Sequence, residues 1–251
     1  QSDAIATLLI PPAEEPLERA PDDVCRAVAL GDRDFLMREE VADLLAGVHR
    51  GQDGLLVAPT SFGKTSLPWT VALQPPAPPS DGPTAGQPLV VVVAPLNSIS
   101  AQHTRTLNER WRRAVGDPAA PDEAGLLGMA ATVDDARERT LAGQYRIVYC
   151  SPERMPRLAQ DLAWAQSTGR LRVTLVLFDE AHTVGWVWRV AMAQLRRAYE
   201  LLPSAVRVAM SATANVEQVR HEIPRAVGLR DAMVRIRSSY RPALQTSVLV
   251  G

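Results

Sequence analysis

The stretch Ala-Pro-Thr-Ser-Phe-Gly-Lys-Thr at residues 58–65 decides the fold of this chain. It matches a phosphate-binding loop, in which a Gly or Ala and four variable residues precede Gly-Lys-Ser or Gly-Lys-Thr. Backbone amides around Gly63 and the N-terminus of the following helix are expected to bind phosphate oxygens. Lys64 is expected to bridge the β- and γ-phosphates of a nucleotide, and the Thr65 hydroxyl to bind Mg²⁺. The nucleotide-binding residues predicted in this loop are Thr60, Ser61, Phe62, Gly63, Lys64, Thr65 and Ser66.

Lys64 is the single lysine among 27 basic residues, and the other 26 are arginine. A lysine ammonium is a compact charge on a flexible stem that can reach between two phosphates, whereas a guanidinium is a broad planar fork. The alternative is a chance placement in a lysine-poor sequence, and the rest of the chain argues against it. Phe62 stands where a Gly or Ser is more usual, and we interpret it as a harmless loop variant.

Length and composition bound the remaining possibilities. The 251 residues suit one large domain or two small ones, and 46% hydrophobic residues can fill a core. The net charge of −1 gives no whole-chain argument for nucleic-acid binding, which must therefore depend on local sites. Cys25 and Cys150 are too few for a disulfide framework or a metal site and are typical of cytosolic thiols. No apolar run reaches transmembrane length and no signal peptide follows Gln1, so we expect a cytoplasmic piece of a longer protein with no membrane partner.

Short apolar runs alternate with amphipathic stretches along the chain. Runs that are apolar almost throughout are typical of parallel strands buried on both faces, and the alternation predicts an α/β fold with right-handed crossovers. The predicted strands are Leu55–Ala58, Leu89–Ala94, Ile147–Cys150, Val173–Phe178 and Val206–Met210. Helices are predicted from Asp22 through Phe35 to Val48 and at residues 65–73, 98–114, 133–142, 153–166, 189–201 and 215–227. Residues 1–20, 74–88 and 116–124 are expected to be irregular.

The predicted strand at residues 173–178 runs directly into Asp179-Glu180-Ala181-His182. The carboxyl ends of parallel strands meet at one edge of a sheet, so these side chains should lie beside the phosphate loop. Asp179 would provide the second contact to Mg²⁺, and Glu180 would orient and deprotonate the attacking water. An acidic N-cap of the next helix is the alternative; it fits Asp179 alone better than it fits the four-residue run.

Asp-Glu-Ala-His, together with Ser211-Ala212-Thr213, resembles the superfamily 2 helicases. Two further stretches are similar to motifs of the RecQ proteins. The first is Pro-Leu-Asn-Ser-Ile-Ser at residues 95–100, and the second is Ser-Pro-Glu-Arg-Met at residues 151–155. Residues 238–244 resemble the segment that leads into the second RecQ motor domain. The resemblance implies a RecA-like domain with a mainly parallel sheet and helices on both faces. Its expected limits are a lead-in and helix at 1–34, the ATP-binding domain at 35–245 and a connection at 246–251.

The resemblance also assigns roles to individual residues. ATP and Mg²⁺ are the expected cofactors, and the catalytic residues are Lys64, Asp179, Glu180 and His182. The residues expected on the DNA side are Pro95, Leu96, Ser98, Ser151, Pro152, Glu153, Arg154, Trp186 and Trp188. The two tryptophans would stack on bases or, alternatively, belong to the core of the next helix. Ser211 and Thr213 would couple the nucleotide site to DNA. Glu39 stands where RecQ proteins read adenine with a Gln, and a carboxylate can only accept hydrogen bonds.

Three functions are compatible with these motifs. The first is the N-terminal motor domain of a RecQ-like DNA helicase or translocase. It would act on single-stranded or forked DNA with a second RecA-like domain absent from this chain, and with protein partners of a DNA repair, modification or defence system. The isolated chain would then hydrolyse ATP poorly. The second is a nucleotide-responsive module that binds DNA or a partner without processive unwinding. The third, an RNA motor, is disfavoured by the motifs at residues 95–100 and 151–155. The arginines at 220, 225, 230, 235, 237 and 241 would face DNA, a partner domain or solvent.

Overall fold

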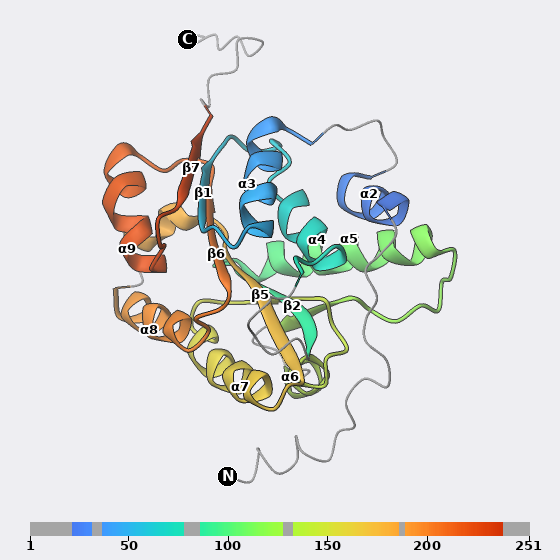
Figure 1. Cartoon of the computed structure of the whole chain (residues 1–251). Coiled ribbons are helices and arrows are strands. Elements are labelled where there is room, and N and C mark those ends of the chain that lie inside the picture. Colours follow the sequence, from blue (N-terminus) through green and yellow to red (C-terminus); the bar gives the residue numbers. More distant parts are fainter. Residues whose placement is uncertain (1–21, 32–36, 78–85, 128–132, 186–188, 238–251) are drawn as a thin grey trace, which may run out of the picture.

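A seven-stranded parallel sheet forms the centre of the molecule in the computed structural model (Figure 1). The structure describes residues 22–31, 37–77, 86–127, 133–185 and 189–237. The strands are β1 (Gly54–Val57), β2 (Gln87–Val93), β3 (Ala124–Leu127), β4 (Ile147–Cys150), β5 (Leu171–Phe178), β6 (Val206–Ser211) and β7 (Met233–Ile236). Their order across the sheet is β3-β4-β2-β5-β6-β1-β7.

Helices cover both faces of this sheet (Figure 1). The first face carries α2 (Asp22–Leu30), α3 (Glu39–His49), α4 (Ser66–Leu73) and α5 (Asn97–Val115). The second carries α6 (Val133–Leu141), α7 (Met155–Ser167), α8 (Arg189–Glu200) and α9 (Ile223–Val227). The predicted α/β fold with a parallel sheet between two helical layers is therefore confirmed.

Continuous apolar strands fit this arrangement because successive side chains enter opposite cores. In β1, Leu55 and Val57 belong to the core under α7–α9, while Leu56 belongs to the core under α2–α5. Phe178 and Leu177 of β5 divide between the two cores in the same way. The sheet is thus held from both sides, and its carboxyl edge is fixed as a platform for the loops that follow the strands.

The structure corrects the sequence prediction at four places. The helix expected from Asp22 to Val48 is two helices, because α2 ends at Leu30 and Gly31 takes a left-handed φ of 82°. The helix predicted at 215–227 contains a π-helical segment, Gln218–Glu222, before α9; Pro224 lacks the amide hydrogen that a regular helix would need there. Two strands, β3 and β7, were not predicted. Both are four residues long and lie at the edges of the sheet.

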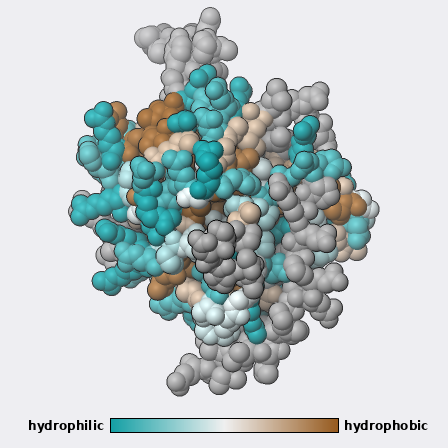
Figure 2. Space-filling view, in the orientation of Figure 1, coloured by the Kyte–Doolittle hydropathy of each residue, from teal (hydrophilic) through white to brown (hydrophobic). Residues whose placement is uncertain are grey.

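The surface is mostly hydrophilic, with a hydrophobic patch in the upper part of Figure 2, where Figure 1 shows β7. Val234 and Ile236 of β7 are 42% and 62% exposed. None of the helices among the described residues is long and apolar enough to cross a membrane. The predicted lead-in, Phe35, Trp186, Trp188 and the segment at 238–251 lie outside the described residues.

Three of the late arginines pair with carboxylates instead of forming a free basic face. Arg230 donates from its backbone and side chain to Asp53, which is only 2% exposed. Asp53 also accepts a hydrogen bond from the backbone of Arg207. Arg235 pairs with Asp43, and Arg237 lies 3.4 Å from a Glu40 oxygen. Two of these arginines therefore tie β7 and the residue after it to α3, and Arg230 binds the loop before β1.

Candidate nucleotide-binding site

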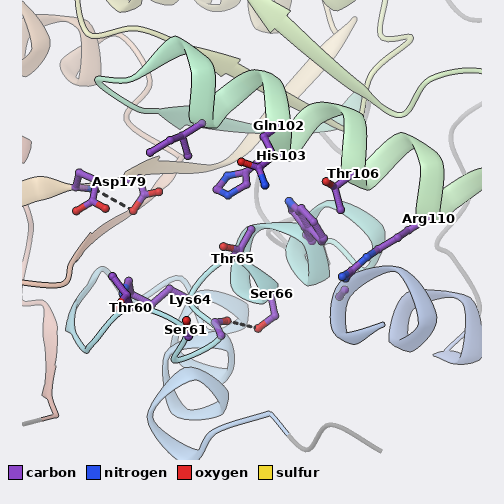
Figure 3. Close-up of a pocket in the computed structure, with 15 residues that line it drawn as sticks. Thr60, Ser61, Lys64, Thr65, Ser66, Gln102, His103, Thr106, Arg110 and Asp179 are labelled. Carbon is purple, nitrogen blue, oxygen red and sulfur yellow. Dashed lines mark hydrogen bonds between the residues drawn. The ribbon is translucent and has the colours of Figure 1, made fainter. Parts of the chain in front are cut away.

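Three neighbouring strands bring the predicted catalytic segments to one edge of the sheet. The order β5-β6-β1 places Asp179, Ser211 and the loop at residues 58–65 at adjacent strand ends. Figure 3 shows Asp179 facing the space above Lys64, Thr60 and Ser61. Parallel strand order therefore explains how residues more than a hundred positions apart share one site.

The backbone of the phosphate loop folds back on Lys64 and accepts its hydrogen bonds. Ser61 and Gly63 have left-handed φ angles of 63° and 88°. The Lys64 Nζ donates to the carbonyl oxygens of Ala58 at 2.7 Å and Pro59 at 2.8 Å. Burial lowers the Lys64 pKa from its ordinary value, although Asp179 and Glu180 oppose the shift. The two carbonyl dipoles compensate the charge of the Lys64 ammonium only in part. A bound phosphate would supply a full negative charge in their place.

Asp179 extends the backbone hydrogen bonding between β5 and β2 by one residue, and the backbone leaves the strand direction at Glu180. The Asp179 amide donates to the Val93 carbonyl of β2 at 2.9 Å. The Glu180 amide donates to the Asp179 Oδ1 at 2.9 Å, and Glu180 has a left-handed φ of 51°. A non-glycine residue in that region of φ is a feature that concentrates at functional sites. Burial raises the pKa of both carboxyls, and for Glu180 the neighbouring Asp179 charge raises it further.

A cavity of about 460 Å³ joins these groups. Its lining includes Thr60, Ser61, Gly63, Lys64, Thr65, Ser66, Asp179 and Glu180. Hydroxyl and carboxylate oxygens are the ligands that Mg²⁺ prefers, so Thr65 and Asp179 form a donor set that fits this ion. Phe62 packs partly into the core under α2–α5 beneath the Arg38 guanidinium, and Glu39 is exposed; neither lines the cavity.

His182 links the end of β5 to the end of β6. Its Nδ1 lies 3.1 Å from the Ser211 hydroxyl and 3.3 Å from a Glu180 carboxylate oxygen. The Ser211 hydroxyl accepts a hydrogen bond from the Thr213 amide, and the Gln218 amide group donates to the His182 carbonyl. Ser211 is fully buried. The predicted coupling residues Ser211 and Thr213 are thus connected to Glu180 through one imidazole.

The two segments predicted to meet DNA lie side by side beyond the catalytic groups. They follow β2 and β4, which are paired in the sheet, and the Ala94 amide donates to the Cys150 carbonyl. In the first segment Pro95 is half-buried, while Leu96 and Ser98 are exposed. In the second, Ser151 and Pro152 are buried, Glu153 is exposed and Arg154 is half-buried. The exposed residues Leu96, Ser98 and Glu153 therefore follow neighbouring strand ends.

Sequence reasoning missed the wall of the cavity formed by α5. His103 lines it, and its ring centroid lies 6.3 Å from that of Trp69 and 6.0 Å from that of Tyr149. The Trp69 Nε1 donates to the Tyr149 hydroxyl at 2.7 Å inside the core. Burial lowers the His103 pKa, opposed by Asp179. The spacing of Ile99, Gln102, His103, Thr106 and Arg110 marks one face of a helix and could have revealed this wall.

Comparison with known proteins agrees with this geometry. The family model for DEAD/DEAH box helicases matches residues 39–221, which is more than half of the chain. The chain belongs to the DEAD/DEAH box helicase family. The matched residues include the phosphate loop and the Asp179-Glu180-Ala181-His182 run that the structure brings together. No curated protein matches the chain by sequence.

Several solved helicases share the fold. The DUF1998 helicase MrfA bound to DNA and AMPPNP is 17% identical with a TM-score of 0.64, covering 95% of this chain and 34% of MrfA. The Mycobacterium smegmatis helicase Lhr bound to ssDNA and AMP-PNP is 22% identical with a TM-score of 0.61, covering 89% of this chain and 28% of Lhr. The Pyrococcus furiosus Hef helicase domain is 20% identical with a TM-score of 0.52, covering 81% of this chain and 38% of the Hef chain. The chain spans about a third of each of these structures, and the likeness shows the fold alone.

Proposed function

We propose that this chain is the ATP-binding motor domain of a RecQ-like DNA helicase or translocase. The observation that carries the proposal is the single cavity shared by Lys64, Thr65, Asp179 and Glu180. Phosphoryl transfer to water requires three kinds of group. They are a cation that binds phosphate oxygens, a hydroxyl and a carboxylate that bind a divalent ion, and a second carboxylate that orients water. Their convergence favours nucleotide hydrolysis over simple anion binding.

Each residue of the site has a defined role in this proposal. Lys64 leaves the carbonyl oxygens of Ala58 and Pro59 and binds the β- and γ-phosphates. Thr65 and Asp179 hold Mg²⁺, which neutralises phosphate charge when bound. Glu180 orients the water that attacks the γ-phosphorus and accepts its proton, giving ADP and inorganic phosphate. The raised pKa of Glu180 makes its carboxylate a stronger acceptor for that proton.

DNA is the proposed track of the motor. The segments at residues 95–98 and 151–154 would contact the phosphate backbone through amides and hydroxyls, which a net charge of −1 permits. The bound DNA in the MrfA and Lhr structures supports this assignment. The His182–Ser211–Thr213 chain would carry the state of the nucleotide to the DNA side. A second RecA-like domain would supply arginines that raise the rate about 10³- to 10⁵-fold in related enzymes.

The second candidate is a nucleotide-responsive module that binds DNA or a partner without processive unwinding. It is favoured by Glu39, which occupies the adenine-reading position of RecQ proteins and is exposed at the start of α3. A carboxylate there cannot donate to a ring nitrogen, so selection of adenine would be weaker.

The test is nucleotide hydrolysis by a polypeptide that contains both motor domains. ATP turnover is expected to rise with single-stranded DNA and to fall at least a hundredfold in Glu180→Gln, which should still bind MgATP. Equal turnover in wild type and Glu180→Gln would remove the motor function. Turnover without strand displacement or translocation would favour the binding module, and stimulation by RNA in place of DNA would favour the RNA motor.

A further inference from the structure

The nucleotide cavity continues past the magnesium ligands along α5. Figure 3 shows Gln102, His103, Thr106 and Arg110 projecting from this helix toward the phosphate-loop helix α4. All four line the same cavity as Lys64 and Asp179. Trp69 of α4 and Ala29 of α2 complete the lining at the Arg110 end. We define this extension, lined by Gln102, His103, Thr106, Arg110 and Trp69, as the α5 groove.

A second cation lies at the far end of the α5 groove. Lys64, Asp179 and Glu180 lie at the catalytic end, and Arg110 lies at the other. In the part of the chain that the structure describes, no carboxylate lies within ion-pair distance of Arg110. The Arg110 guanidinium therefore offers an anion a second cationic site beyond the two carboxylates.

Arg110 is held in place without being neutralised. Its Nη1 donates to the Val28 carbonyl of α2 at 3.1 Å, and its guanidinium lies 5.4 Å from the centre of the Trp69 ring. These contacts fix the plane of the guanidinium and leave donors for an oxyanion. The side chains of Gln102 and Thr106 make no hydrogen bond with another described residue, so their donors are free to join such a site.

We propose that the α5 groove is an oxyanion subsite that receives the inorganic phosphate released from the phosphate loop. This inference rests on the proposed function, because phosphate forms there only if the chain hydrolyses ATP. The ligand is a tetrahedral oxyanion whose oxygens would accept hydrogen bonds from the Arg110 guanidinium, the Thr106 hydroxyl and the Gln102 amide.

Titration of inorganic phosphate, followed by ³¹P line broadening, tests the subsite directly. The titration uses a Lys64→Ala chain, which removes the lysine of the phosphate loop. Saturable binding is expected there, and adding Arg110→Gln should weaken it at least fivefold. Thr106→Val keeps the side-chain shape and should weaken binding about two- to threefold. Arg105→Gln, on an exposed position of α5 outside the lining, is the matched control and should change the affinity less than twofold.

Three outcomes are informative. Equal phosphate affinity with and without Arg110→Gln, in protein that melts normally, would overturn the subsite. Weaker MgADP binding in Arg110→Gln with Lys64 intact would mean that the nucleotide itself occupies the groove, which also overturns it. Failure of the wild-type chain to bind MgADP would sink the proposed function, while the phosphate titration would still decide whether Arg110 holds an oxyanion.

Discussion

The Nδ1 atom of His182 lies 3.1 Å from the hydroxyl oxygen of Ser211, joining the ends of β5 and β6 through two side chains. The same Nδ1 lies 3.3 Å from a Glu180 oxygen, so the two contacts compete for one ring nitrogen. A change in the charge around Glu180 would favour one of the two His182 contacts over the other. The Ser211 hydroxyl would transmit this change to Thr213, because it accepts a hydrogen bond from the Thr213 amide. This is the physical basis for the proposed coupling between nucleotide and DNA.

Ser211→Ala should destabilise the chain as well as uncouple it. The substitution leaves the Thr213 amide without its acceptor beside a fully buried position. We expect the free energy of unfolding to fall by about 0.5–1.5 kcal/mol, the net value of a typical intramolecular hydrogen bond, because Thr213 itself is exposed. Urea denaturation measures it. Ser167→Ala, at an exposed hydroxyl at the end of α7, should change the value by less than about 0.5 kcal/mol.

Asp179→Asn should stabilise the nucleotide-free chain at neutral pH. Burial raises the folded pKa of Asp179 above its unfolded value, so its contribution to stability is present at low pH and lost as pH rises through the folded pKa. Removing the charge should raise the free energy of unfolding at pH 7 by about 0.5–2 kcal/mol, as is common when a functional site is relieved. The gain should shrink toward pH 4. A gain that grows on acidification would contradict this account.

Asp53→Ala should lower the free energy of unfolding by about 2–3 kcal/mol, the value of a lost hydrogen bond to a charged group. The buried Asp53 carboxylate accepts from the backbone amides of Arg207 and Arg230 and from the Arg230 guanidinium. Asp43→Ala breaks the half-exposed ion pair with Arg235 and should lower the free energy of unfolding by less than about 1 kcal/mol. Thermal or urea unfolding of the two variants compares them. Similar losses would mean that Asp53 does not anchor β6 and β7.

Cys150 should resist alkylation in the folded chain. It is 1% exposed, and burial raises the pKa of its thiol to about 12. Because the thiolate is the reactive form, raising the pH from 7 to 9 should leave native labelling by iodoacetamide negligible. Labelling should become complete in denaturing urea. Fast modification of Cys150 in native protein, located by mass spectrometry, would show that the strand before Ser151 opens.

Continuous apolar runs allowed the central strands to be predicted from sequence. Residues such as Leu177 and Phe178 are buried on opposite faces, so the pattern carries a strong signal. The edge strands β3 and β7 carry little of it. Gly125 interrupts the first, and exposed Val234 and Ile236 alternate with half-buried residues in the second. Pairing with β4 and β1 defines these strands, and pairing is not visible in a four-residue window.

The candidate site was predictable where chemistry depends on consecutive residues. The phosphate loop and Asp179-Glu180 each form a short motif, and strand order brings them together. His103 and Arg110 could not be assigned in the same way, because their role depends on which face of α5 meets α4. The helix expected from Asp22 to Val48 failed for a local reason, the left-handed backbone of Gly31. Predictions at Trp186 and Trp188 lie outside the described residues and stay predictions.

The central claim is that Lys64 and the carboxylates after β5 form one nucleotide site. Isothermal titration of MgATP into the wild-type chain and into Lys64→Ala tests it most directly, with Arg105→Ala as a control on an exposed surface. The account predicts binding by the wild type and the control, and affinity at least tenfold weaker in Lys64→Ala, a loss of about 1.4 kcal/mol or more. Equal affinity for MgATP in wild type and Lys64→Ala would contradict it.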